Sequence, residues 1–127
     1  EGKVELVAWA LEPQALKIGG EAKLKLYWRA KRSMSRNWKV FVHIDAHGQR
    51  IHADHDPVEG LLPTARWREG ELIQDVYPFK VKPTLTPATF KAYVGLYRGK
   101  RRLEIKEGPK GRVTKDNRAL LGHVRVH

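Results

Sequence analysis

Apolar and polar residues alternate with a period of two along three segments of the chain. These segments are 22–30, 38–46 and 90–97. In the first, Lys23 precedes Leu24, and Lys25 separates Leu24 from Leu26. Successive side chains of a β-strand point to opposite faces, so this pattern predicts strands that bury one face and expose the other. On the second segment we expect Phe41, His43 and Asp45 to share the face that points away from the core.

Five further segments alternate less regularly and are predicted to be weaker strands. They are 4–11, 49–55, 72–81, 102–105 and 119–126. Residues typical of turns separate the segments, at 19–20, 47–48, 83–87, 98–99 and 108–111. Hardly any window has helical periodicity. The sequence therefore predicts an all-β, antiparallel two-sheet sandwich of about eight strands, with either an immunoglobulin-like or a jelly-roll topology.

One long segment, 56–70, has no strand pattern. It contains Pro57, Gly60 and Pro63, and we expect a short helical turn around 64–68. Long loops inside compact domains are more often functional than idle.

The length of 127 residues suits one domain, predicted over 1–127, and the absence of cysteine excludes disulfides and thiolate metal sites. Hydrophobic residues make up 41% of the chain, but no segment approaches the ~20 apolar residues of a membrane-spanning helix. The chain begins at Glu1 without a signal peptide. We therefore expect a domain taken from a larger protein.

Twenty-five Lys and Arg residues against 14 Asp and Glu give a formal net charge of +11, which favours anionic partners. Cations are concentrated in 29–39 and 98–115, whereas 50–75 is acidic. The candidate basic patch consists of Arg98, Lys100, Arg101, Arg102, Lys110 and Arg112. Such a patch suits nucleic acid or anionic lipid, although no nucleic-acid module motif is present.

Several short motifs occur one after another along the chain. They comprise Leu26-Tyr27-Trp28-Arg29, Val40-Phe41-Val42-His43-Ile44-Asp45, Gly48, Asp56-Pro57, Gly60, Pro63-Thr64, Trp67, Gly70-Glu71, Asp75 and Tyr93-Val94-Gly95-Leu96-Tyr97. This series resembles a β-sandwich domain of bacterial membrane proteins. That domain is the extracytoplasmic, often C-terminal, part of multi-pass glycosyltransferases of the dolichyl-phosphate-mannose–protein mannosyltransferase type, and it also occurs in related envelope proteins.

The resemblance implies a fold and a setting rather than a mechanism. It implies a location on the extracytoplasmic face of a bacterial envelope. It also implies a membrane-bound domain of the same parent chain as the partner.

The string from 56 to 75, which includes the long loop, carries the candidate ligand-binding residues. They are Asp56, Thr64, Trp67, Glu71 and Asp75. In the structural interpretation, which we favour, Asp56 forms an Asx-turn, Thr64 caps a helical turn and Trp67 plugs the end of the sandwich. In the alternative, Trp67 stacks on a sugar and the acids accept hydrogen bonds from its hydroxyls.

A second candidate site lies on the predicted hairpin of 43–56. His43, Asp45, His52 and Asp54 are spaced so that imidazoles and carboxylates can converge on a divalent metal. A solvated face with scattered histidines is the interpretation we favour.

Catalysis has little support in the sequence. Ser33 and Ser35 lack the G-x-S-x-G context of a nucleophile, and 108–111 is not a phosphate-binding loop. We therefore expect neither a catalytic residue nor a cofactor. The predicted function is a non-catalytic accessory domain of a bacterial envelope protein that mediates carbohydrate or protein contacts. The alternatives are a basic module for nucleic acid or anionic lipid, and a divalent-metal-binding domain.

Overall fold

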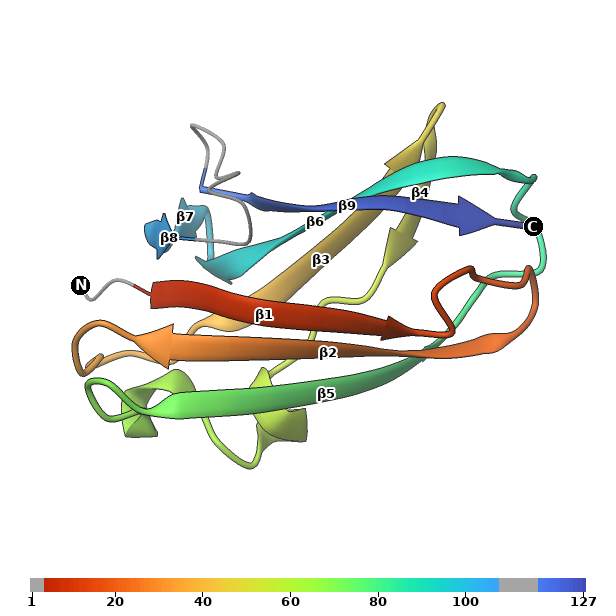
Figure 1. Cartoon of the computed structure of the whole chain (residues 1–127). Helices are drawn as coiled ribbons and strands as arrows, with labels where there is room; N and C mark the ends of the chain where they lie inside the picture. The colour runs from red at the N-terminus through yellow and green to blue at the C-terminus, as the bar shows by residue number, and fades with distance from the viewer. Residues whose placement is uncertain (1–3, 108–116) are drawn as a thin grey trace.

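The computed structural model describes residues 4–107 and 117–127, which form two β-sheets packed face to face (Figure 1). The strand order is β5-β2-β1-β8 in the first sheet and β4-β3-β6-β7 in the second, where β9 also pairs with β6. The first sheet contains β1 (Val4–Glu12), β2 (Glu21–Ala30), β5 (Leu72–Lys80) and β8 (Ile105–Glu107). The second sheet contains β3 (Lys39–Ala46), β4 (Gln49–His52), β6 (Ala88–Arg98), β7 (Arg101–Arg102) and β9 (Ala119–Val126).

The topology is immunoglobulin-like. In the first sheet β2 lies between β1 and β5, in the second β6 lies between β3 and β9, and all four pairings are antiparallel. The first, second and fifth strands thus share one sheet, and the third, sixth and last share the other. The predicted all-β sandwich is confirmed, and the strand order selects one of the two topologies that the sequence left open.

The core lies between the sheets and is built from the alternating segments. The apolar residues at every second position of β2, β3 and β6 are buried, as the periodicity predicted. Trp28, Trp67 and Phe90 are the largest fully buried side chains. Complete burial of one such side chain stabilises the fold by about 2–3 kcal/mol.

Two predicted strands differ from the observed ones. The segment 49–55 forms β4 only as far as His52. The predicted strand 102–105 is wrong, because the chain crosses there from β7 in the second sheet to β8 in the first. Leu103 still donates a backbone hydrogen bond to Leu96, whereas Glu104 already accepts one from Val4. Alternation survives across the crossing because both sheets face the same core.

The long loop contains two 3-10 turns, Pro57–Gly60 and Thr64–Arg66, and the second lies where a helical turn was expected. Gly70 N donates to Ala30 O at 2.7 Å, which returns the chain to the first sheet. Across the described residues no helix has the length and apolarity needed to cross a bilayer.

Candidate functional site

The predicted loop residues divide into buried and exposed ones. Thr64, Trp67 and Asp75 are 0%, 1% and 0% exposed, whereas Asp56 and Glu71 are exposed. The indole Nε1 of Trp67 donates to the Leu62 carbonyl at 2.9 Å. Because the Trp67 ring lies inside the core, it offers no face on which a sugar can stack. The sugar-stacking role considered for Trp67 therefore has no geometric support.

Thr64 joins the long loop to the segment before β3. Its hydroxyl donates to the Arg36 carbonyl at 2.6 Å and accepts from Trp38 N at 2.9 Å. The predicted capping role is wrong, because Pro63 occupies the N-cap position of that turn. Asp56, at the start of the other turn, makes no side-chain cap hydrogen bond. The Thr64 hydroxyl instead forms hydrogen bonds with the backbone of Arg36 and Trp38, which are distant from Thr64 in the sequence.

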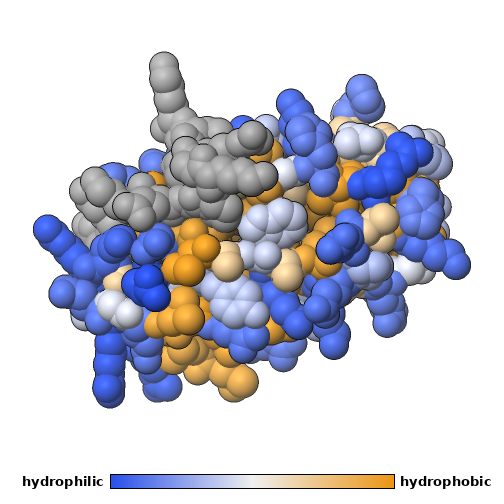
Figure 2. All heavy atoms as spheres, in the orientation of Figure 1, coloured by the Kyte–Doolittle hydropathy of each residue, from blue (hydrophilic) through white to orange (hydrophobic). Residues whose placement is uncertain are grey.

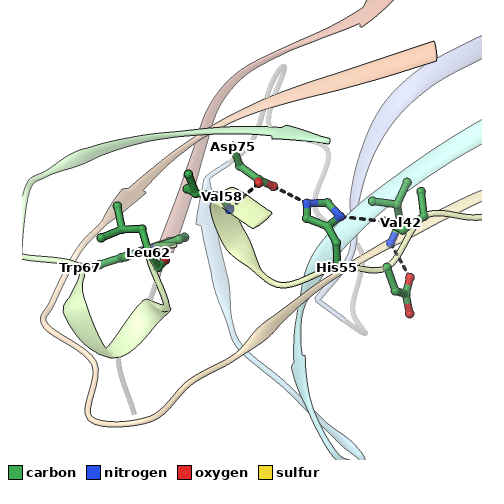
Figure 3. A network of polar contacts seen from close by, with 8 residues as sticks. Val42, His55, Val58, Leu62, Trp67 and Asp75 are labelled. Carbon is green, nitrogen blue, oxygen red and sulfur yellow. Dashed lines mark hydrogen bonds and ion pairs between the residues drawn. The ribbon is translucent and has the colours of Figure 1, made fainter. Parts of the chain in front are cut away.

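Asp75 forms a buried pair with His55, a residue that the sequence analysis did not single out (Figure 3). His55 Nε2 lies 2.5 Å from Asp75 Oδ2, and Val58 N donates to Asp75 Oδ1 at 2.8 Å. His55 Nδ1 lies 2.8 Å from the Ala53 carbonyl. A carbonyl oxygen only accepts, so Nδ1 donates to Ala53, and the contact between Nε2 and Oδ2 requires a hydrogen between these two atoms.

The pair connects the loop to both sheets. Asp75 belongs to β5, whereas the backbone of His55 exchanges hydrogen bonds with Val40 of β3 at 2.8 and 2.9 Å. The His55 ring also stacks on Tyr77, with centroids 4.1 Å apart and an interplanar angle of 3°. These contacts give the long loop a structural role.

The four candidate metal ligands are engaged in other contacts or separated. Arg50 donates to both carboxylate oxygens of Asp45, at 2.6 and 2.8 Å, and these bonds hold the pKa of Asp45 below its ordinary value. Asp54 Oδ1 accepts from Val42 N at 2.9 Å. The rings of His43 and His52 lie opposite each other on the hairpin, nearly perpendicular, with centroids 6.5 Å apart. In the described part of the chain, no three His, Asp or Glu side chains are grouped as a metal ion requires.

The structure instead brings two of the hairpin residues, His43 and Asp54, close to three residues of the basic patch. These three are Lys100, Arg101 and Arg102. A groove of about 390 Å³ lies on the outer face of the second sheet. We call it the basic groove. It is lined by Phe41, His43, Asp54, Tyr97, Gly99, Lys100, Arg101 and Arg102. It forms because β3 pairs with β6, and β7 folds back along the end of β6 after the turn at 99–100.

Phe41 forms the floor of the basic groove. Although it points away from the core, it is only 2% exposed. Its ring lies across Gly95 of β6, where a Cβ atom would overlap the ring. The Arg102 guanidinium carbon lies 4.8 Å from the Phe41 centroid, and the Tyr97 ring is 6.2 Å away. Glycine at position 95 is thus required by Phe41, a constraint visible only in the strand register.

His43 lies beside this floor, 4.9 Å from Phe41 between ring centroids. Its Nδ1 is buried without a hydrogen-bond partner. Burial is the main cause that lowers the pKa of His43, helped by Arg50 and Arg102 and opposed by the carboxylates of Asp54 and Asp45. We therefore expect His43 to be neutral near pH 7.

The remaining members of the predicted basic patch lie elsewhere. Arg98 is exposed on β6 and does not line the groove. Lys110 and Arg112 lie outside the described residues. Arg118 adds a further cation to the same sheet, because its guanidinium carbon lies 4.1 Å from the Tyr93 centroid. The outer face thus combines aromatic rings with several cations, an arrangement that suits negatively charged groups.

No family model and no curated protein matches this chain. Among solved structures, it is similar to a Niemann-Pick type C2 protein from the Japanese carpenter ant, with a TM-score of 0.60 and 9% identity over 99% of this chain and 92% of the other. It is also similar to the CARDB domain of a Pyrococcus furiosus protein in complex with di-metal ions, with a TM-score of 0.51, 16% identity and the same coverage. At these identities the likeness shows a shared β-sandwich fold alone. The resemblance to the glycosyltransferase-associated domain stays a prediction.

Proposed function

We propose that this chain is a non-catalytic accessory domain of a bacterial envelope protein, and that its basic groove binds acidic polysaccharide. The observation that carries the proposal is the meeting of Lys100, Arg101 and Arg102 over the aromatic floor formed by Phe41 and Tyr97. The setting, beside a membrane-bound domain of the same parent chain, follows from the family resemblance. The net charge of +11 also favours an anionic ligand.

The charges of the basic groove favour an anionic ligand. Lys100 and Arg101 are exposed, and within the described residues neither takes part in an ion pair. Asp54, the one carboxylate among the described residues that line the groove, accepts a hydrogen bond from Val42 N. The carboxylate or sulfate groups of an acidic polysaccharide can pair with the two exposed cations.

The burial of Phe41 favours polysaccharide over nucleic acid. Binding of single-stranded nucleic acid relies on aromatic faces on which bases stack. Of the two rings in the groove, Phe41 is 2% exposed and already carries the Arg102 guanidinium, and Tyr97 is half-buried, so neither offers a base a fully open face. A polymer held through its charges alone does not need an open ring face.

The groove also lacks the groups needed for glycoside hydrolysis. That reaction uses two carboxylates that flank the scissile bond. The described residues that line the groove supply Asp54 alone. This supports a binding role without catalysis.

The test is calorimetric titration with polygalacturonate, with neutral dextran as the matched polymer. We expect binding to polygalacturonate only, and affinity that falls steeply as salt rises from ~50 to ~200 mM. The double variant Lys100→Glu/Arg101→Glu should bind roughly tenfold or more weakly. Lys80→Glu/Lys82→Glu makes the same change in net charge at exposed positions outside the groove and should retain the affinity. Equal losses of affinity in the two variants would show that binding depends on net charge alone. That result would contradict the proposed site.

The net charge of +11 also favours a second candidate function, which is binding to nucleic acid or anionic lipid. Single-stranded DNA and vesicles containing phosphatidylglycerol are therefore titrated in parallel. Binding to either with an affinity above that for polygalacturonate would favour this candidate.

A further inference from the structure

A second groove lies at the open edge of the sandwich, where β1 and β9 run side by side (Figure 1). We call it the edge groove, and its volume is about 590 Å³. It is lined by Trp9, Ala10, Leu11, Glu12, Pro13, Gln14, His123 and Val124. It shares no residue with the basic groove.

Each of these two strands carries a β-bulge beside this groove. In the pairing of β1 with β2, Leu6 and Ala8 face consecutive residues of β2, so Val7 is extra. In the pairing of β9 with β6, Leu121 is extra between Leu120 and Gly122. A bulge bends its strand and changes where the following side chains point. Trp9 comes two residues after the first bulge, and Gly122 adjoins the second.

Gly122 lies beside the Trp9 indole. Its φ of 152° lies in a region that residues with a Cβ rarely adopt, and a Cβ placed there would lie 3.9 Å from Trp9 Cζ2. The backbone of β9 therefore passes close beside the ring. The indole of β1 thus lies next to the backbone of β9.

Trp9 differs from the other three tryptophans in its exposure. Trp28, Trp38 and Trp67 are 0%, 5% and 1% exposed, whereas Trp9 packs against the core and is only partly buried. Part of its ring is thus accessible from the groove. Figure 2, which views the molecule from the same side as Figure 1, shows apolar and weakly polar residues across the middle of this face and hydrophilic residues around them.

Polar groups surround the indole on the rim of the edge groove. Glu12, Gln14 and His123 are all exposed, and they supply a carboxylate, an amide and an imidazole. Glu12 also accepts a hydrogen bond from Lys25 Nζ at 3.1 Å, which holds the carboxylate in place. Ala10, Leu11, Pro13 and Val124 complete an apolar lining.

We infer that the edge groove is a binding site for an uncharged sugar residue, with Trp9 as the stacking platform. A pyranose ring has an apolar face of C–H groups and a rim of hydroxyls, which matches an indole bordered by hydrogen-bonding side chains. The lining contains one carboxylate and neither Lys nor Arg, so it does not favour an acidic sugar. The inference does not depend on the proposed function of the basic groove.

The experiment is NMR titration of the ¹⁵N-labelled protein with cello-, manno- and chito-oligosaccharides, following the four tryptophan indole N–H signals. Saturable binding of at least one series, with the largest shift at Trp9, is expected. No shift of the Trp9 signal with any of the three series at about 10 mM, a concentration that detects even millimolar dissociation constants, would overturn the inference.

Variants separate stacking from folding. Trp9→Ala should weaken binding about tenfold or more. Gln14→Ala changes only an exposed rim residue and should weaken binding several-fold with the fold intact, so the test holds even where Trp9→Ala destabilises the protein. The control Lys82→Ala changes an exposed residue outside both grooves and should bind the neutral oligosaccharide normally. Unchanged affinity in both Trp9→Ala and Gln14→Ala would contradict the assigned site.

Discussion

The long loop and the outer face of the second sheet contain the same kinds of residue, an aromatic ring, acids and histidine, but use them in opposite ways. At the long loop, the Trp67 ring lies in the core, and Asp75 of the following strand β5 is paired with His55, which precedes the loop. On the outer face, Phe41 supports a groove that remains open and is bordered by cations such as Arg101. The comparison teaches that a motif rich in aromatic and acidic residues indicates a site only when its side chains point outward. Four substitutions test this difference.

The largest effect is expected for Trp67→Ala. Removing a fully buried indole should lower the free energy of unfolding by about 3–5 kcal/mol, through lost burial and the cavity that remains. Urea denaturation measures this loss. Titration with polygalacturonate should show unchanged affinity in the folded variant. A stable Trp67→Ala protein with weakened ligand binding would reverse the roles assigned to the two regions.

The next effect concerns the buried pair. Asp75→Ala leaves the His55 ring and Val58 N without their buried acceptor, and should cost about 2–4 kcal/mol. A double-mutant cycle with His55→Ala isolates the coupling between the two side chains. Additive losses would show that the pair does not act as a unit.

Gly95→Ala tests the floor of the basic groove. The added methyl group overlaps the Phe41 ring and lies 2.9 Å from Asn117 O, so about 1–3 kcal/mol of stability should be lost. Because Phe41 must move, affinity for polygalacturonate should fall as well. In the Phe41→Ala background the same substitution should cost less. An equal cost in both backgrounds would mean that Phe41 does not require the glycine.

The smallest effect is a pH dependence at His43. Its pKa in the folded protein is lowered from 6.5, mainly by burial, so the folded state binds fewer protons than the unfolded state. The resulting stability is present above pH 6.5 and is lost as pH falls from 6.5 to the lower folded pKa. His43→Gln cannot titrate and should lose less stability than the wild type between about pH 7.5 and 5. Parallel curves for the two proteins in urea denaturation would contradict this.

Local patterns account for most of the successful predictions. The positions of the long strands and their buried faces follow from alternation, since strand geometry sends every second side chain to the same side. The same reasoning failed at 102–105, because alternation continues while the chain moves from one sheet to the other. Sequence patterns also did not identify His55 as the partner of Asp75, because no spacing rule connects the two residues.

Both grooves depend on contacts between residues far apart in the chain. Phe41 lies opposite Gly95 only through the register of β3 and β6, and the β6–β7 turn brings Arg101 to the same groove. The edge groove needs β1 beside β9, strands from the two ends of the chain that belong to different sheets. Periodicity carries no information on such neighbours.

The all-β sandwich, the faces of its main strands and the strong positive charge could be predicted from the residues, because each is a local or additive property. The accessible tryptophan, the paired acids and the cations that line a groove could be identified from the folded chain alone. Those properties depend on strand order, register and bulges, which arise from packing the whole chain. The long loop therefore supports the fold, and the sheet face and the open edge are the candidate binding surfaces.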